Sequence, residues 1–314
     1  MTSRKEILRS VGLVLLSVLL IQGQATQSPQ SPSGRTPPQA PAAAPTAQPS
    51  FKFGILGDTG TGGREQYEVG DRLVKARATF PFDMVVMLGD NLYGGESERD
   101  FQNKFEKPYK ALLDGGVKFY ASLGNHDLPD RQIAYKHFNM NGKRYYSFKP
   151  QNGIRFFALD SNYVDKKQLD WLDAELKNSG SEWKIAFFHH PLYSSGEKHG
   201  PSVELRKVLE PLFLKYGVDV VLAGHEHLYE RLKPQQGIQY FILGSSAKLR
   251  KGGLIVDSDL TAKGFDTDNV FMIAEITGDE MSFQVISRTG VNIDSGKFRR
   301  VERNGSRQGA SIIP

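Results

Sequence analysis

The sequence FKFGILGDTG, residues 51–60, is a short apolar run that ends in a glycine and an aspartate. Such a run is typical of a buried β-strand, and the glycine permits a sharp turn where the strand ends. Apolar runs that end in polar side chains recur in MVVMLGDNLY (84–93), KFYASLGNHD (118–127), KIAFFHH (184–190) and VDVVLAGHEH (218–227). Because ligands bind at the carboxyl ends of the strands in open α/β sheets, we expect these polar side chains to form one site.

The rest of the folded chain alternates between strand-like and helix-like segments. Strands are predicted over 51–57, 84–88, 118–123, 154–159, 184–188, 218–223 and 239–243, with a hairpin formed by 270–276 and 281–287. Apolar residues at helical spacing predict helices over 65–79, 166–177 and 203–216. This alternation predicts a single α/β domain over residues 51–314.

Composition excludes several kinds of protein. The 314 residues include no cysteine, which excludes a disulfide framework, a thiolate metal site and a cysteine nucleophile. Residues 51–314 hold 36 of the 40 Lys and Arg and 34 of the 35 Asp and Glu, so this part is nearly neutral. A nucleic-acid-binding protein needs a concentrated basic surface. The basic residues near the C-terminus are interpreted as a solvated face.

The N-terminal residues carry the features of an export signal. Three basic residues precede an apolar run from Val11 to Ile21, which at 11 residues is too short to span a bilayer. We interpret residues 1–25 as a signal peptide cleaved after Ala25; the alternative is an uncleaved anchor. Residues 26–50 contain seven prolines and are predicted to be a disordered linker rich in Pro, Ala, Ser and Gln. The protein is therefore expected to be exported, to the periplasm or the medium.

The side chains at the strand ends are good ligands for transition metals. They are Asp58, Asp90, Tyr93, Asn125, His189, His225 and His227. Oxygen and nitrogen donors of these types suit iron, zinc or manganese. The set is too large for one such ion and about right for two ions that share a carboxylate, so we predict a dinuclear metal centre.

The order and spacing of these motifs resemble the purple acid phosphatases of the small, tartrate-resistant type, within the calcineurin-like metallophosphoesterases. The resemblance runs from about residue 51 to residue 244. It implies a four-layer α/β/β/α sandwich with the ligands at the carboxyl ends of the strands.

The resemblance also implies how the ligands are divided between the metals. Fe(III) is expected at the site of Asp58, Asp90, Tyr93 and His227. Fe(II), Zn(II) or Mn(II) is expected at the site of Asp90, Asn125, His189 and His225, so that Asp90 bridges the two. Tyr93 marks the subclass, because most other metallophosphoesterases have a histidine where Gly60 stands and lack a tyrosine ligand.

The implied activity is hydrolysis of phosphate monoesters by a hydroxide activated at this centre. His126 occupies the position of a phosphate-contacting residue, and His199 resembles the loop histidine that protonates the leaving group. His190 is left out of the ligand set, because adjacent residues on a strand point to opposite faces.

The expected partners are small phosphomonoester substrates, with no nucleic acid, no membrane span after signal cleavage, and a monomeric state. Two alternatives stay open. One is a metallophosphodiesterase that acts on nucleotides or phospholipid headgroups with two divalent ions. The other is a metal-binding surface protein without catalysis.

Overall fold

The computed structural model describes residues 50–300 and 311–313. The signal peptide predicted over 1–25 and all of the linker except Ser50 lie outside these residues and stay predictions. Ser50, placed at the end of the linker from the sequence, is the first residue of strand β1.

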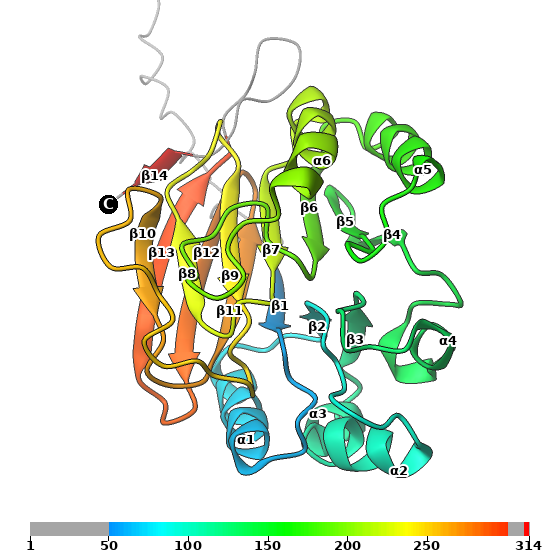
Figure 1. The fold of residues 1–314 in the computed structure, drawn as a ribbon, viewed down its shortest axis with the longest axis vertical. Coiled ribbons are helices and arrows are strands. Elements are labelled where there is room, and N and C mark those ends of the chain that lie inside the picture. The colour runs from blue at the N-terminus through cyan, green and yellow to red at the C-terminus, as the bar shows by residue number, and fades with distance from the viewer. Residues whose placement is uncertain (1–49, 301–310, 314) are drawn as a thin grey trace, which may run out of the picture. The chain divides into compact units, whose positions relative to one another are not determined.

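Two seven-stranded sheets form the centre of the fold (Figure 1). The first has the order β14 (Ser311–Ile313), β13 (Asn292–Arg299), β12 (Glu280–Ser287), β11 (Val270–Thr277), β1 (Ser50–Leu56), β2 (Met84–Met87) and β3 (Lys118–Ala121). The second has the order β10 (Thr261–Phe265), β8 (Tyr229–Leu232), β9 (Gln239–Leu243), β7 (Val220–Ala223), β6 (Trp183–Phe188), β5 (Ile154–Ala158) and β4 (Tyr146–Gln151). The strands that lead into the polar motifs pair in parallel with one another: β1 with β2 and β2 with β3 in the first sheet, and β6 with β7 in the second.

Helices cover the sheets in two groups (Figure 1). The first comprises α1 (Arg64–Thr79), α2 (Glu98–Phe101), a π-helix over Gln102–Glu106, α3 (Lys110–Asp114), α4 (Pro129–Gln132) and a 3₁₀ turn over Lys136–Phe138. The second comprises α5 (Lys166–Lys177) and α6 (Val203–Tyr216). Within residues 50–300 and 311–313, no helix has the length and apolar character needed to cross a membrane.

Neighbouring side chains along a strand face different layers of the fold. On β5, Phe156 faces the other sheet, with its ring 5.2 Å from that of Phe53 in an edge-to-face contact. Its neighbour Phe157 belongs to the separate apolar cluster that includes Leu172 of α5 and Phe213 of α6. On β1, a side chain added at Gly54 would meet Leu73 of α1. The predicted α/β/β/α sandwich is therefore confirmed.

The predicted strands and helices are all present, with ends shifted by a few residues. The sequence analysis missed β4, β8, β10, β13 and β14. Three of these, β4, β10 and β14, are edge strands, and β4 contains Pro150. An edge strand has a neighbouring strand on one side only and is less covered by the rest of the protein. It therefore carries fewer apolar side chains, and its hydrophobic signal in the sequence is weak.

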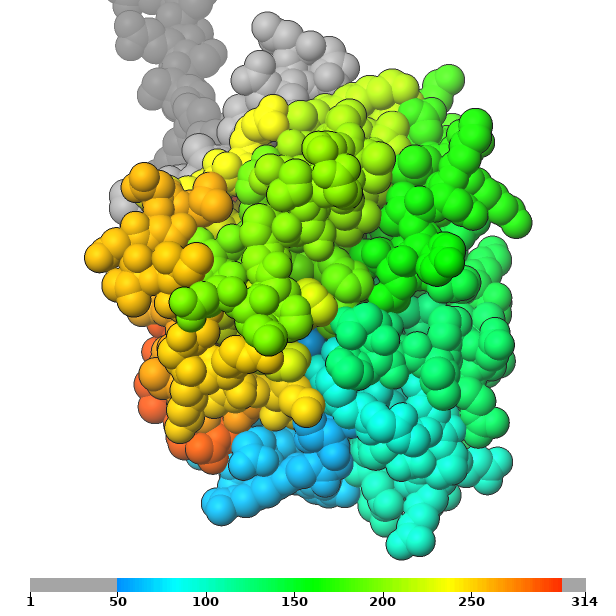
Figure 2. Space-filling model, in the orientation of Figure 1, coloured from blue at the N-terminus to red at the C-terminus, as the bar shows by residue number. Residues whose placement is uncertain are grey.

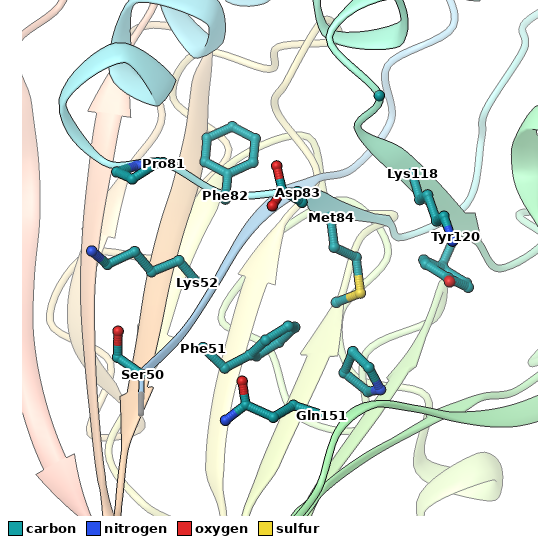
Figure 3. Close-up of a pocket in the computed structure, with 12 residues that line it drawn as sticks. Ser50, Phe51, Lys52, Pro81, Phe82, Asp83, Met84, Lys118, Tyr120 and Gln151 are labelled. Atoms are coloured by element: carbon teal, nitrogen blue, oxygen red, sulfur yellow. The ribbon is translucent and has the colours of Figure 1, made fainter. Parts of the chain in front are cut away.

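The cavity in Figure 3, about 580 Å³, lies at the amino ends of the first three parallel strands. It is lined by Ser50 and Lys52 of β1, Met84 of β2 and Lys118 of β3. The polar motifs follow the opposite ends of the same strands. This cavity is therefore separate from the candidate metal centre.

The inter-sheet layer can be tested with Phe156→Ala. The ring is fully buried, so its removal should lower the free energy of unfolding by about 3–5 kcal/mol through lost contacts and a cavity. Urea denaturation followed by tryptophan fluorescence measures this. Val256→Ala is the control, because that side chain is 79% exposed and should change stability by less than about 0.5 kcal/mol. Equal small losses in both variants would contradict the packing described here.

Candidate metal centre

The five motifs follow β1, β2 and β3 of the first sheet and β6 and β7 of the second. The site lies where the carboxyl ends of strands from the two sheets meet. Atoms of these segments, coloured blue through yellow, come together near the centre of the face shown in Figure 2. All of the predicted ligand residues contribute to this region.

Tyr93 lies against an aspartate and a histidine. Its Oη is 3.1 Å from Asp58 Oδ1 and 3.3 Å from His227 Nε2. A nitrogen of His227 and carboxylate oxygens of Asp58 and Asp90 all lie within 4.8 Å of one another. Four oxygen and nitrogen donors thus lie as close together as the ligands of one metal ion do.

The second group of donors is built around His189. Its Nδ1 donates to the carbonyl of Leu88 at 3.0 Å, which leaves Nε2 of the neutral ring without a proton. That Nε2 lies 3.0 Å from Asn125 Oδ1, 3.1 Å from His225 Nδ1 and 3.5 Å from Asp90 Oδ1. Lone pairs of His189 and Asn125 therefore face each other with no hydrogen between them, an arrangement that a cation would stabilise. Asp90 lies close to both groups of donors.

Three of these residues have unusual backbone conformations. Asp58, Asp90 and His225 have φ angles of 55°, 50° and 71°, in the left-handed region. Side-chain-bearing residues rarely adopt this region, and where they do the strain is often part of a functional site. The strain here turns each side chain back towards the junction of the sheets.

Glycines allow the ligand loops to approach one another. A Cβ at Gly124 would collide with the backbone nitrogen and Oδ1 of Asp90. A Cβ at Gly224 would lie 2.5 Å from Asp58 Oδ2. Neither position can carry a larger residue without moving an aspartate, so the glycines in these motifs are required by close contact.

Electrostatics also fit metal binding. Burial lowers the pKa of His225 to about 2 and that of His227 to about 4. Both imidazoles are therefore neutral and can donate an electron pair to a metal ion. Burial, and then the neighbouring Asp90, raise the pKa of Asp58 well above its usual range. Burial, and then Asp58, raise the pKa of the Tyr93 phenol. A cation bound among these groups would favour the ionised forms of both Asp58 and Tyr93.

The two predicted catalytic histidines lie beside the ligands. The ring of His126 is 4.9 Å from that of Tyr93, and its backbone N–H donates to Asp90 Oδ1 at 3.0 Å. The ring of His199 lies 4.2 Å from that of His225. Both side chains are exposed to solvent, as substrate-contacting groups must be.

His190, which the sequence left out of the ligand set, lies beside the second group of donors. Its ring lies 4.4 Å from that of His225, and its nitrogen falls within 4.8 Å of the donor atoms of His189 and His225. The alternation rule does not apply, because β6 ends at Phe188 and both histidines lie in the loop beyond it. Ser161 Oγ, 2.9 Å from Nδ1, holds the ring in place.

Two buried carboxylates within the motifs position the loops. Asp127 accepts hydrogen bonds from the N–H groups of Leu92 and Gly124 and from the side chains of Asn91 and Gln132. Burial and the nearby Asp90 raise the pKa of Asp127 to about 8.

Glu226 acts in the same way on the loop of His199. Its Oε1 accepts from the backbone N–H groups of His199 and Gly200, at 2.7 and 2.6 Å. The sequence analysis assigned no role to Asp127 or Glu226. In the sequence, the only indication of a role for these two residues is that they lie inside the motifs GNHD and GHEH.

This fold and this site define a metal-dependent phosphoesterase. Residues 51–229 match the family model described as calcineurin-like phosphoesterase, so the chain belongs to that family. Family membership implies a dinuclear metal centre, and the two groups of donors supply the residues to hold one.

Within the family, the chain is most readily compared with acid phosphatases. It is 29% identical over 246 residues to tartrate-resistant acid phosphatase type 5 of Homo sapiens, covering 65% of this chain and 75% of the human one. A purple acid phosphatase from yellow lupin seeds superposes with a TM-score of 0.65 at 17% identity, covering 80% of this chain and 54% of the lupin one. The resemblance to purple acid phosphatases is thus confirmed.

The fold also occurs in a protein named for another role. GAP50, described as the anchor in the inner membrane complex of Plasmodium, superposes with a TM-score of 0.70 at 19% identity, covering 80% of this chain and 89% of GAP50. The fold alone therefore does not establish catalysis, which has to be argued from the site.

Asp127→Asn tests the support of the ligand loops. The amide would place an NH₂ group against backbone and side-chain donors, which should weaken metal affinity by roughly 10–100-fold. Metal content after dialysis against a graded chelator series measures this. Asp130→Asn, an exposed change three residues away in α4, is the control. Equal metal retention in both variants would show that Asp127 does not position the loop.

Proposed function

We propose that this protein is an exported acid phosphatase that hydrolyses phosphate monoesters at a dinuclear Fe(III)–M(II) centre, where M is Fe, Zn or Mn. The observation that carries the proposal is the position of Tyr93. Its Oη lies within 3.3 Å of both Asp58 and His227, as expected if all three residues bind the same metal ion. A phenolate is a hard anionic donor, and it favours a ferric ion over a divalent one.

The residues that would hold the metals are those already described. Asp58, Tyr93 and His227 would hold Fe(III), Asn125, His189 and His225 would hold the divalent ion, and Asp90 would bridge them. A bound pair of metal ions supplies Lewis acidity and makes a water molecule acidic enough to act as a nucleophile. The chain's own residues then have to bind and orient the ester and manage its protons.

His126 would bind the phosphate group. Its ring lies beside Tyr93 at the solvent-exposed edge of the donors, where an imidazole N–H can donate to a phosphate oxygen. The hydrogen bond from its backbone to Asp90 fixes its position relative to both groups of donors.

His199 would protonate the leaving group. Glu226 holds its backbone, and its ring lies over that of His225. As the ester bond breaks, an N–H of the His199 imidazolium would transfer its proton to the departing oxygen, which leaves as an alcohol or phenol.

Export is the part of the proposal that rests on the sequence, and a monomeric state is proposed with it. The basic start and the apolar run from Val11 to Ile21 support export. Amino-terminal sequencing of the protein recovered outside the cytoplasm, with gel filtration, tests both.

Tyr93→Phe tests the metal assignment. The purified wild-type protein should show a broad absorption band in the green–yellow region from tyrosinate-to-Fe(III) charge transfer, and the band should vanish in the variant. Tyr163→Phe is the control, since that side chain is 73% exposed. A colourless wild-type protein with full metal content would exclude a tyrosinate–ferric centre. A higher rate on bis(p-nitrophenyl) phosphate than on p-nitrophenyl phosphate would then establish a phosphodiesterase.

His199→Gln tests the proton donor. The rate on an alkyl phosphate, whose leaving group needs a proton, should fall by roughly 10²–10⁴-fold. The rate on p-nitrophenyl phosphate should fall far less, because p-nitrophenolate leaves without a proton. Glu197→Gln, an exposed change two residues away, should alter neither rate. Equal losses on both esters would assign His199 to substrate binding instead.

A further inference from the structure

We propose that Lys248 and Arg250 bind a second anionic group of the substrate, so that the enzyme prefers phosphate monoesters whose leaving group itself carries a negative charge. This inference rests on the proposed function and names the substrate class of the same site. Neither residue belongs to a motif at a strand end. Both lie in the segment after β9, which is gold in Figure 2 and borders the centre of the face shown.

The backbone of this segment is tied to the ligand loops. The N–H of Lys248 donates to the carbonyl of Asp58 at 3.1 Å, and the N–H of Arg250 donates to the carbonyl of His227 at 2.9 Å. Asn269 Nδ2 donates to the carbonyl of Lys248 at 3.3 Å. The two cationic residues are therefore held at a defined place beside the first group of donors.

The side chain of Lys248 lies over the tyrosine. Its Nζ is 4.4 Å from the centre of the Tyr93 ring. Within the described residues, this ammonium group forms no ion pair with a carboxylate. It is partly exposed, so an anion arriving from solvent can reach it.

Arg250 has an unsatisfied donor. Its Nη1 is buried and has no hydrogen-bond partner among the described residues. Its charge contributes to the lowered pKa of His227, for which burial is the main cause. A buried guanidinium nitrogen without a partner is costly. The residue as a whole is only partly buried, and a movement of its side chain that brought this nitrogen to an anionic oxygen would remove that cost.

The nearby acids do not neutralise this pair. Glu226 Oε1 already accepts from the N–H groups of His199 and Gly200. Asp58 and Asp90 belong to the donor groups that would bind metal. The transferred phosphoryl group has its own contacts in the proposed mechanism, with His126 and the metals. The two extra cations are therefore available to a further carboxylate or phosphate on the substrate.

The test uses a pair of probes that differ only in charge. The binding probes are 4-carboxyphenylphosphonate and its neutral twin 4-carbamoylphenylphosphonate, neither of which can be hydrolysed at an ester bond. Titration calorimetry on the metal-loaded full chain gives both dissociation constants. The wild-type protein should bind the carboxylate about tenfold more tightly, the equivalent of one charge-assisted hydrogen bond.

Lys248→Met and Arg250→Met should each remove most of this preference, while Arg250→Lys should retain part of it. Lys251→Met is the matched control, because it removes an exposed charge from the same segment. If Arg250→Met does not fold, the preference for the carboxylate probe measured in Lys248→Met and Arg250→Lys still tests the proposal. The matching aryl phosphates should show the same preference in kcat/KM.

Three results would overturn the inference. One is equal binding of both twins by the wild-type protein. The second is an equal loss for both twins in the variants, which would assign the cations to the phosphoryl group itself. The third is a Lys248→Met variant with an altered absorption band and an unaltered preference, which would assign Lys248 to Tyr93 alone. If the phosphonates bind with the expected preference but neither ester is hydrolysed, the proposed function fails, and only the binding of a second anionic group by Lys248 and Arg250 stands.

Discussion

The burial of two carboxylates side by side is the constraint on which the site depends. Asp58 and Asp90 are at most 1% exposed, and each raises the electrostatic cost of ionising a neighbour. Two such groups cannot both carry charge in an apolar surrounding without a cation close by. The neutral imidazoles and the amide oxygen around them can donate electron pairs but cannot compensate the charge, so the arrangement makes chemical sense only with metal ions.

The backbone accommodates this arrangement at a cost that the rest of the fold has to offset. Three ligand residues adopt left-handed conformations, and glycines stand where a side chain would displace an aspartate. The carboxylates of Asp127 and Glu226 accept hydrogen bonds from the backbone N–H groups of Gly124 and His199, and so hold the loops around the site. The two packed sheets supply the stable base, with aromatic side chains such as Phe53 and Phe156 filling the layer between them.

Sequence reasoning worked best where function depends on local features. Gly57–Asp58 and Gly89–Asp90 could be recognised because an apolar strand, a turn and a polar side chain are neighbours along the chain. It did not place His190 beside His189 and His225, because the rule of alternating faces ends where β6 ends, one residue before His189. It also overlooked Lys248 and Arg250, which follow a strand but carry no motif, and whose position depends on hydrogen bonds to loops far away in the sequence.

The sequence by itself determined the kinds of donor, their order along the chain and the strands that carry them. These properties reside in residue types and in the short-range pattern of apolar and polar side chains. Only the tertiary structure decided that the donors come from two sheets, that Asp90 lies close to both donor groups, and that a cationic segment lies against Tyr93. Those facts depend on how distant strands pair and how the sheets pack, and that packing is set by the sum of many long-range apolar contacts that no single stretch of sequence contains.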